Sequence, residues 1–169
     1  NRIGMSGHSF GAITTMMLAG QSTALGMSFG DPRVKAAIAY SPSKPRMGSP
    51  EKAFASIKIP TFHMTGTKDT TPFDNGEPPE SRQLPYQNIH GPDKYLIVFK
   101  DGDHMIFSGR VPRSGPRPHD ETFHALINKA SLAFWDAYLM GNKDAKAYLT
   151  DGRLKQDLGG EGTFAFETR

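Results

Sequence analysis

The chain has 169 residues, of which 37% are apolar and 22% charged, a composition ordinary for a soluble globular domain with a core and unlike that of a disordered or fibrous chain. Its net charge is +3, but the Lys and Arg residues are scattered and form no basic strip of the kind that binds nucleic acid. The lack of cysteine excludes disulfides and thiolate metal sites, and no apolar run approaches the ~20 residues of a membrane span.

The first predicted element is a short strand over residues 2–6, which runs into the pentapeptide Gly7-His8-Ser9-Phe10-Gly11. A helix is expected to follow from Ala12, with a buried pattern that continues to Ala24. A bare Gly-x-Ser-x-Gly also arises by chance in a chain with 18 glycines. The strand, turn and helix around it resemble the nucleophile elbow of α/β-hydrolases, and this context favours a functional serine.

The two glycines of the pentapeptide are predicted to relieve crowding, because a Cβ at Gly7 or Gly11 would press on the neighbouring strand or helix. Ser9 could then adopt an unfavourable backbone conformation, at a cost of about 1–3 kcal/mol, and turn its Oγ away from the sheet. The backbone N–H of Phe10 would lie at the start of the next helix, where it can form half of an oxyanion hole.

Strands and loops alternate in the middle of the chain. Residues 34–40 and 61–66 are short apolar runs typical of a parallel sheet. Residues 95–99 are β-branched and aromatic, the clearest strand in the chain. Residues 73–93 and 108–118 are rich in turn-forming residues and are expected to be irregular.

The last part of the chain is predicted to be mostly helical. A helix over residues 120–140 ends at the C-cap Gly141-Asn142 and is followed by a shorter one over 145–149. The tail, residues 150–169, could add an edge strand. The element order predicts a single α/β domain over residues 1–169, a mostly parallel sheet flanked by helices, with ligands beyond the carboxyl ends of the strands.

Three residues at predicted strand ends suggest a catalytic triad. An acyl-transfer serine needs a base to accept its proton and an acid to hold that base in the right tautomer, and in α/β-hydrolases the chain order is Ser, then Asp or Glu, then His. Ser9, Asp69 and His104 follow that order, and each comes just after a predicted strand. Three neighbouring strand ends could therefore converge on one point.

Five other histidines compete with His104 for the role of base, namely His8, His63, His90, His119 and His124. His63 lies within a strand and is expected to be packed and hydrogen-bonded. His8 lies inside the elbow and is expected to point away from Ser9 as a packing residue. The pair at 119 and 124 lacks the spacing of a His-x-x-x-His zinc motif.

The acid has competitors as well. Asp103 is adjacent to His104 and is badly placed to reach its neighbour's Nδ1, Asp101 lies on the histidine's own loop, and Asp74 is five residues further from its strand than Asp69. Asp69 is preferred because it lies in the first turn after its strand. The alternative is a turn-forming Asp69 whose side chain bonds nearby backbone N–H groups.

Three segments together, Gly7-His8-Ser9-Phe10-Gly11, Phe62-His63-Met64-Thr65-Gly66-Thr67-Lys68-Asp69 and Gly102-Asp103-His104, resemble the C-terminal half of the α/β-hydrolase superfamily over roughly residues 1–140. The chain looks most like dienelactone-hydrolase-like and polyester-hydrolase-like esterases of bacteria, which lack a large cap, and the short 41–59 connection agrees. It departs from them in having Ser9 where dienelactone hydrolases use cysteine and in lacking the tryptophan platform of polyester hydrolases after Tyr40. The irregular segments are expected to form the pocket walls instead.

The resemblance implies a serine esterase that acts on a small-molecule carboxylic ester through an acyl-enzyme, with no metal or organic cofactor. Acyl transfer, peptide hydrolysis and cofactor-free haloperoxidation use similar triads and stay open. So does a non-catalytic α/β-hydrolase-like binding module, which a wide separation of Asp69 and His104 would favour.

The resemblance also implies that the early strands of the sheet and the loop with the second oxyanion donor lie upstream of residue 1. The strand at residues 3–6 would then be an exposed sheet edge, and such edges invite pairing. We expect this edge to pair with a missing N-terminal segment or with a second copy of the chain. Secretion or a periplasmic location fits the family, with any targeting signal outside the given sequence.

Overall fold

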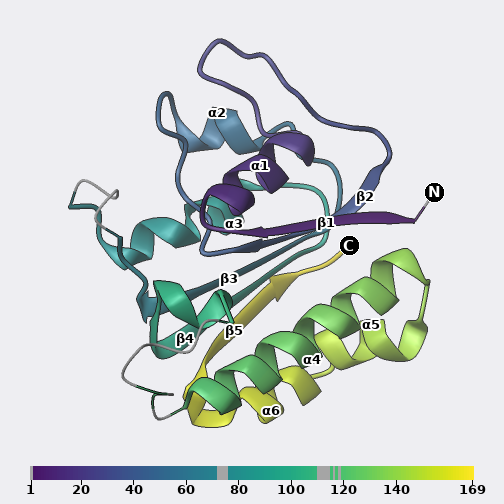
Figure 1. The fold of residues 1–169 in the computed structure, drawn as a ribbon. Coiled ribbons are helices and arrows are strands. Elements are labelled where there is room, and N and C mark those ends of the chain that lie inside the picture. The colour runs from purple at the N-terminus through teal and green to yellow at the C-terminus, as the bar shows by residue number, and fades with distance from the viewer. Residues whose placement is uncertain (1, 72–75, 110–114, 116, 118) are drawn as a thin grey trace.

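The computed structural model describes residues 2–71, 76–109, 115, 117 and 119–169, and in this part of the chain one five-stranded sheet carries helices on both faces (Figure 1). The strands are β1 (Ile3–His8), β2 (Val34–Tyr40), β3 (Thr61–Lys68), β4 (Lys94–Asp103) and β5 (Gly162–Glu167). They lie in sequence order, with the first four parallel and β5 antiparallel to β4. The α/β fold class predicted from the sequence is confirmed.

The helices form two layers. One face of the sheet carries α1 (Phe10–Leu18), α2 (Pro50–Phe54) and α3 (Leu84–Asn88), and the other carries α4 (Asp120–Leu139), α5 (Lys143–Thr150) and α6 (Arg153–Leu158) (Figure 1). Three short 3₁₀ helices complete the described elements: η1 (Pro79–Gln83), η2 (His104–Phe107) and η3 (Gly159–Glu161). Because both faces are covered, β3 is buried at every residue from Thr61 to Gly66 rather than in alternation.

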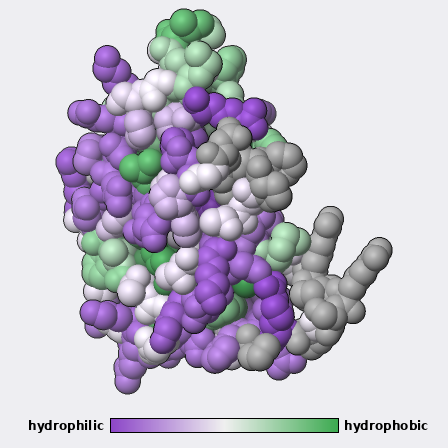
Figure 2. Space-filling model, turned by 90° about the vertical axis from the view of Figure 1, so that its left-hand side faces the viewer, coloured by the Kyte–Doolittle hydropathy of each residue, from purple (hydrophilic) through white to green (hydrophobic). Residues whose placement is uncertain are grey.

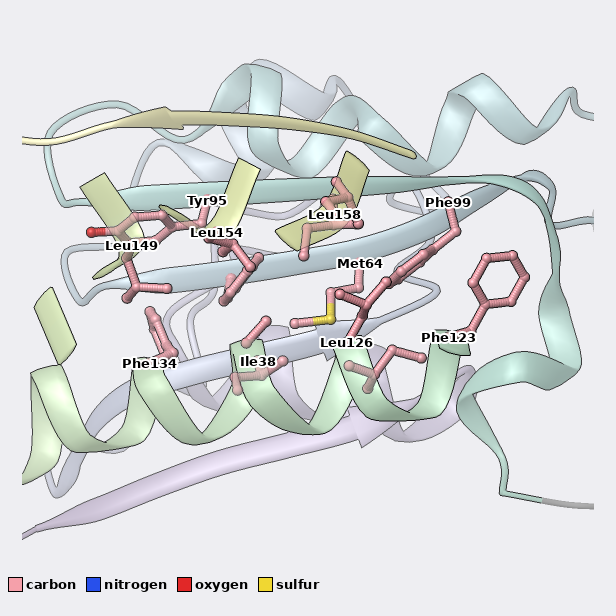
Figure 3. Packing of buried hydrophobic residues seen from close by; sticks show 14 of the residues in the cluster. Ile38, Met64, Tyr95, Phe99, Phe123, Leu126, Phe134, Leu149, Leu154 and Leu158 are labelled. Carbon is pink, nitrogen blue, oxygen red and sulfur yellow. The ribbon is translucent and has the colours of Figure 1, made fainter. Parts of the chain in front are cut away.

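Two apolar cores lie on opposite faces of the sheet. Alternate residues of β2 show the division, since Ile38 belongs to the core under α4 to α6 and Ala39 to the core under α1 to α3. The first core is the larger and is rich in aromatic rings (Figure 3). At its centre Phe134 of α4 is fully buried, with its ring centroid 5.6 Å from that of Phe62 and 5.9 Å from that of Tyr95. This packing fixes α4 against β3 and β4.

The face shown in Figure 2 is mostly hydrophilic, with hydrophobic side chains gathered at the top of the view. The loop between α1 and β2 exposes Leu25, Met27 and Phe29. Across the described residues, no helix combines the length and the apolar character that crossing a membrane requires.

The structure corrects several expected boundaries. The first helix ends at Leu18 rather than continuing to Ala24, because Gly20 has a φ of +116°, which an α-helix does not tolerate. The segment 73–93, expected to be irregular, contains η1 and α3. Each is a short helix of five residues with a proline in its first two positions, Pro79 in η1 and Pro85 in α3, and is too short to leave a periodic apolar pattern. Most of the segment 108–118 lies outside the described residues.

The aromatic core gives a stability prediction. Phe134→Ala removes a fully buried ring and should lower the free energy of unfolding by about 3–5 kcal/mol. Leu132→Ala on the same helix is the matched control, because Leu132 is 61% exposed and its loss should change stability by less than about 0.5 kcal/mol. Urea unfolding followed by circular dichroism measures both. Equal losses in the two variants would contradict the assignment of this core.

Candidate active site

The three residues of the predicted triad are each the first residue after a strand. Ser9 follows β1, Asp69 follows β3 and His104 follows β4. These strands are parallel, so their carboxyl ends meet at one edge of the sheet. Ser41 occupies the same position after β2, which lies between β1 and β3.

The three side chains form a hydrogen-bonded row. His104 Nε2 lies 2.9 Å from Ser9 Oγ, and His104 Nδ1 lies 2.8 Å from Asp69 Oδ1. Asp69 is fully buried and the His104 side chain is 13% exposed. An ionised Asp69 carboxylate can only accept hydrogen bonds. It therefore favours the His104 tautomer that carries hydrogen on Nδ1, and this tautomer directs a lone pair on Nε2 at the serine hydroxyl.

The backbone at Ser9 explains why its hydroxyl is available to the histidine. Ser9 has φ 59° and ψ −116°, an unusual conformation for a residue with a side chain. Its N–H continues the sheet by donating to Tyr40 O, and its carbonyl accepts from the N–H of Ala12 and of Ile13 in α1. The side chain makes no cap hydrogen bond to the helix. The backbone therefore ties strand to helix, and the Oγ is left to bond His104.

The two glycines of the elbow differ in the space around them. A Cβ at Gly7 would lie 2.3 Å from the backbone C and O of Gly11, so the turn closes only with glycine at position 7. At Gly11 a Cβ would meet no described atom within 4 Å. The predicted crowding is wrong for Gly11, because that residue is already in α1, where a side chain points outward from the helix.

Another glycine brings the acid and the base together. A Cβ at Gly66 in β3 would lie 2.1 Å from Gly102 O in β4, and the pairing register of the two strands shifts just beyond this point. The strands can approach this closely only because position 66 has no side chain. Their ends, which carry Asp69 and His104, consequently lie within hydrogen-bond reach of each other.

Further side chains surround the Asp69 carboxylate. Ser41 Oγ donates to Oδ1 at 2.8 Å, Thr65 Oγ1 donates to Oδ2 at 2.8 Å, and Arg82 Nε lies 2.9 Å from Oδ1. Ser41 Oγ is also 2.8 Å from His104 Nδ1. Sequence reasoning missed Ser41 and Arg82. Ser41 comes just after a predicted strand, as the triad residues do, and this position could have identified it. Arg82 lies in a segment without any pattern that could have identified it.

The competing acids are engaged elsewhere or are not described. Asp103 bonds Arg117 and accepts from the N–H of Met105, and these donors outweigh the effect of burial and hold the pKa of Asp103 below its usual value. Asp101 pairs with Lys68 at 2.8 Å on the exposed surface. Asp74 lies outside the described residues.

The other histidines lie apart from Ser9 or contact the row from the side. His63 is fully buried in β3 and its Nε2 bonds Thr61 Oγ1 at 3.1 Å. His8 packs its ring against His104, with 4.6 Å between ring centroids. Its pKa is lowered by burial and then by the nearby His104, so a positive charge on His8 is disfavoured.

The remaining histidines are His90, which is exposed, His119, whose Nδ1 lies 3.0 Å from Glu161 Oε2, and the half-buried His124. Within the described ranges, no three His, Cys, Asp or Glu side chains gather as metal ligands would.

The chain matches the family model described as serine hydrolase (FSH1) over residues 3–108, more than half of its length. It belongs to this serine hydrolase family. The matched range of this serine hydrolase includes Ser9, Ser41, Asp69, Arg82 and His104, and therefore the whole hydrogen-bonded group. No curated protein matches the chain.

The elbow of the serine hydrolase predicts opposite effects of two similar substitutions. Gly7→Ala forces a methyl group against backbone atoms and should lower the free energy of unfolding by at least about 1–3 kcal/mol. Gly11→Ala adds a methyl group to open space in a helix and should raise it by about 0.5–1 kcal/mol. Urea unfolding of the two variants measures the difference. A destabilised Gly11→Ala protein would show that the elbow is crowded on both sides.

The buried His63 should make the free energy of unfolding fall in acid. Burial, with a smaller effect from Lys94, lowers the pKa of His63 from 6.5 to about 3. Below pH 6.5 the unfolded chain binds a proton at this site that the folded protein does not bind until about pH 3. The stability that is fully present above pH 6.5 is therefore lost progressively as the pH falls towards 3, by up to about 1.4 kcal/mol per pH unit.

His63→Gln removes this titration, so its free energy of unfolding should fall less steeply between pH 6.5 and pH 4.5 than that of the wild-type protein. Urea unfolding at a series of pH values gives both slopes. Equal slopes would mean that His63 takes up its proton in the folded state as readily as in the unfolded one.

Proposed function

We propose that this serine hydrolase cleaves carboxylic esters through an acyl-enzyme, with Ser9 as nucleophile, His104 as general base and Asp69 as the orienting acid. The observation that carries the proposal is the double engagement of His104, 2.9 Å from Ser9 Oγ and 2.8 Å from Asp69 Oδ1. Both separations are within the reach that proton transfer and tautomer control require. They also argue against a non-catalytic binding module, which has no need of this arrangement.

The proposed reaction uses His104 twice. As Ser9 Oγ attacks the ester carbonyl carbon, its proton passes to His104 Nε2, and the carbonyl oxygen becomes an oxyanion. The tetrahedral intermediate collapses when the imidazolium returns the proton to the leaving alcohol, which leaves an acyl group on Ser9. A water molecule then gives a proton to Nε2 and attacks the acyl carbon. The second collapse releases the carboxylic acid and restores the proton to Ser9 Oγ.

Asp69 and Phe10 would support the charges that arise in these steps. The Asp69 carboxylate stabilises the imidazolium through the Nδ1 hydrogen and keeps the ring in place. The backbone N–H of Phe10 begins the nine-residue helix α1 directly after the nucleophile. We propose it as one oxyanion donor, because a helix N-terminus favours negative charge and a backbone donor there needs no rearrangement.

The ester class is favoured over other acyl chemistry by the resemblance to dienelactone-hydrolase-like and polyester-hydrolase-like esterases. In residues 41–59, all of which are described, the structure has one helix, the five-residue α2. This connection is too small for a cap domain, and we propose that substrates reach Ser9 directly from solvent. Nitrophenyl esters of increasing acyl length, with an anilide of the same acyl group, would separate ester from amide hydrolysis and define the length preference.

A fluorophosphonate probe tests the nucleophile. The wild-type protein should form a covalent adduct that peptide mass spectrometry locates on Ser9, and nitrophenyl ester hydrolysis should fall by at least about 10⁴-fold in Ser9→Ala. An adduct on another serine, or none in the folded protein, would refute the proposal.

The base is tested with a matched pair of histidines. His104→Gln should lose activity to a similar extent, because His104 is the side chain that hydrogen-bonds Ser9 Oγ in the part of the chain that the structure describes. His90→Gln changes an exposed loop histidine remote from the row and should leave kcat and KM within about two-fold of the wild-type values. If the His104→Gln protein folded and retained most of its kcat, another base would have to be sought.

A further inference from the structure

Arg82 is a buried charge beside the triad whose presence the triad roles do not explain. It is 3% exposed, and its η1 helix belongs to a part of the chain without a catalytic motif. A guanidinium removed from water needs a carboxylate or several acceptors to replace its hydration. Arg82 has both in the Asp69 carboxylate and a set of backbone oxygens.

The contacts of Arg82 join two loops at the carboxyl edge. Its Nε lies 2.9 Å from Asp69 Oδ1 and donates to the Asp69 backbone O at 2.8 Å. Its Nη1 donates to the backbone O of Ser41 and of Pro42, at 3.3 Å each. The guanidinium thus links the residue after β2 to the residue after β3. A lysine could replace the charge but not these several directions of donation.

Ser41 completes the arrangement from the other side of the carboxylate. It is fully buried, has a φ of 53°, and lies 2.8 Å from both Asp69 Oδ1 and His104 Nδ1. Its single proton can serve only one of them. If that proton goes to the ionised carboxylate, a lone pair of Ser41 Oγ faces Nδ1 and favours a hydrogen there. If it went to Nδ1, the ring hydrogen would be on Nε2 and the base would be blocked.

We propose that Ser41 and Arg82 form a clamp on Asp69, two positioning residues that align its carboxylate with His104 and fix the ring tautomer needed to accept the Ser9 proton. The proposal rests on the ester hydrolysis proposed above and extends it by assigning roles to residues outside the triad. Asp69 Oδ1 is the common point, since Ser41, Arg82 and His104 all meet it. Loss of either clamp residue removes one of the contacts that hold Oδ1 of the carboxylate toward the ring.

Variants at both positions test the clamp through kcat. A hydrogen bond to a charged group contributes about one to two powers of ten, so we expect kcat to fall about 10-fold in Ser41→Ala and about 10- to 100-fold in Arg82→Gln. KM should stay within about three-fold, because neither side chain is placed to contact substrate. Arg82→Lys, which keeps the charge, should recover part of the loss.

Two further variants separate the hydroxyl from other effects. Ser41→Gly also lacks the hydroxyl but adopts a φ of 53° without strain, so it should lose as much kcat as Ser41→Ala. Ser43→Ala is the control, because Ser43 Oγ contacts Arg82 at 3.4 Å but makes no described contact with Asp69, and its kcat should stay within about two-fold. Wild-type kcat in Ser41→Gly or in folded Arg82→Gln would overturn the proposal.

A measurement that does not depend on turnover tests the clamp separately from the proposed ester hydrolysis. Proton NMR of the wild-type protein should show a downfield imidazole N–H signal that is missing in His104→Gln. Arg82→Gln and Ser41→Gly should weaken it or move it, and Ser43→Ala should leave it in place. An unchanged signal in the two clamp variants refutes the clamp. A wild-type protein with the signal but without a Ser9 adduct refutes ester hydrolysis alone.

If Arg82→Gln does not fold, a double variant replaces it. Asp69→Asn alone leaves a buried guanidinium without its counter-charge and should lower the urea midpoint of unfolding. Adding Arg82→Gln removes that charge as well and should raise the midpoint of Asp69→Asn. A double variant less stable than Asp69→Asn would show that the two charges do not depend on each other, and the clamp would be rejected.

Discussion

A carboxylate that is taken out of water is stable only where donors replace its hydration shell, and Asp69 is such a carboxylate. The groups that contact its carboxylate come from four places in the chain: Ser41 after β2, Thr65 within β3, Arg82 in η1 and His104 after β4. One buried charge therefore ties together segments that the sheet alone brings only near each other. The position of the His104 ring, and with it the bond to Ser9, follows from how this charge is satisfied.

The sheet in turn supports backbone conformations that isolated turns would avoid. Ser9 and Ser41 both have positive φ, and each such residue costs about 1–3 kcal/mol. In both cases the N–H still bonds the next strand, Ser9 to Tyr40 O and Ser41 to Met64 O. The hydrogen-bond ladder thus extends one residue past each strand, and the strained residue is held by the sheet while its side chain turns toward the site. Because β1 to β4 pair in parallel, the sheet determines which site residues are neighbours as well as the edge at which they lie.

The fold class and the grouping of Ser9, Asp69 and His104 could be predicted because they depend on local signals: apolar runs, a Gly-x-Ser-x-Gly turn and polar residues just past strands. Arg82 could not, since its burial is decided by acceptors that arrive from loops more than ten residues away. The crowding at Gly11 was predicted from the motif and was wrong, because the start of α1, which decides the space there, lies one residue before it. Helices as short as α2 and α3 leave no periodic apolar pattern in the sequence by which they could be predicted.

Each end of the sheet carries a network of polar side chains, and the two networks differ in their chemistry. At the amino end of β4, Asp93 bonds Tyr138 of α4, Lys146 of α5 and the backbone N–H of Arg169. Burial and the neighbouring Tyr95 and Asp93 raise the pKa of Tyr138. A phenol that stays protonated across the working range of pH is a fixed donor, suited to holding helices on a sheet. At the carboxyl end the corresponding network contains His104 and the hydroxyl of Ser9, between which a proton passes in the proposed reaction. Because the two networks lie at opposite ends of the strands, the first can hold the helices on the sheet during the proton transfers that we propose for the second.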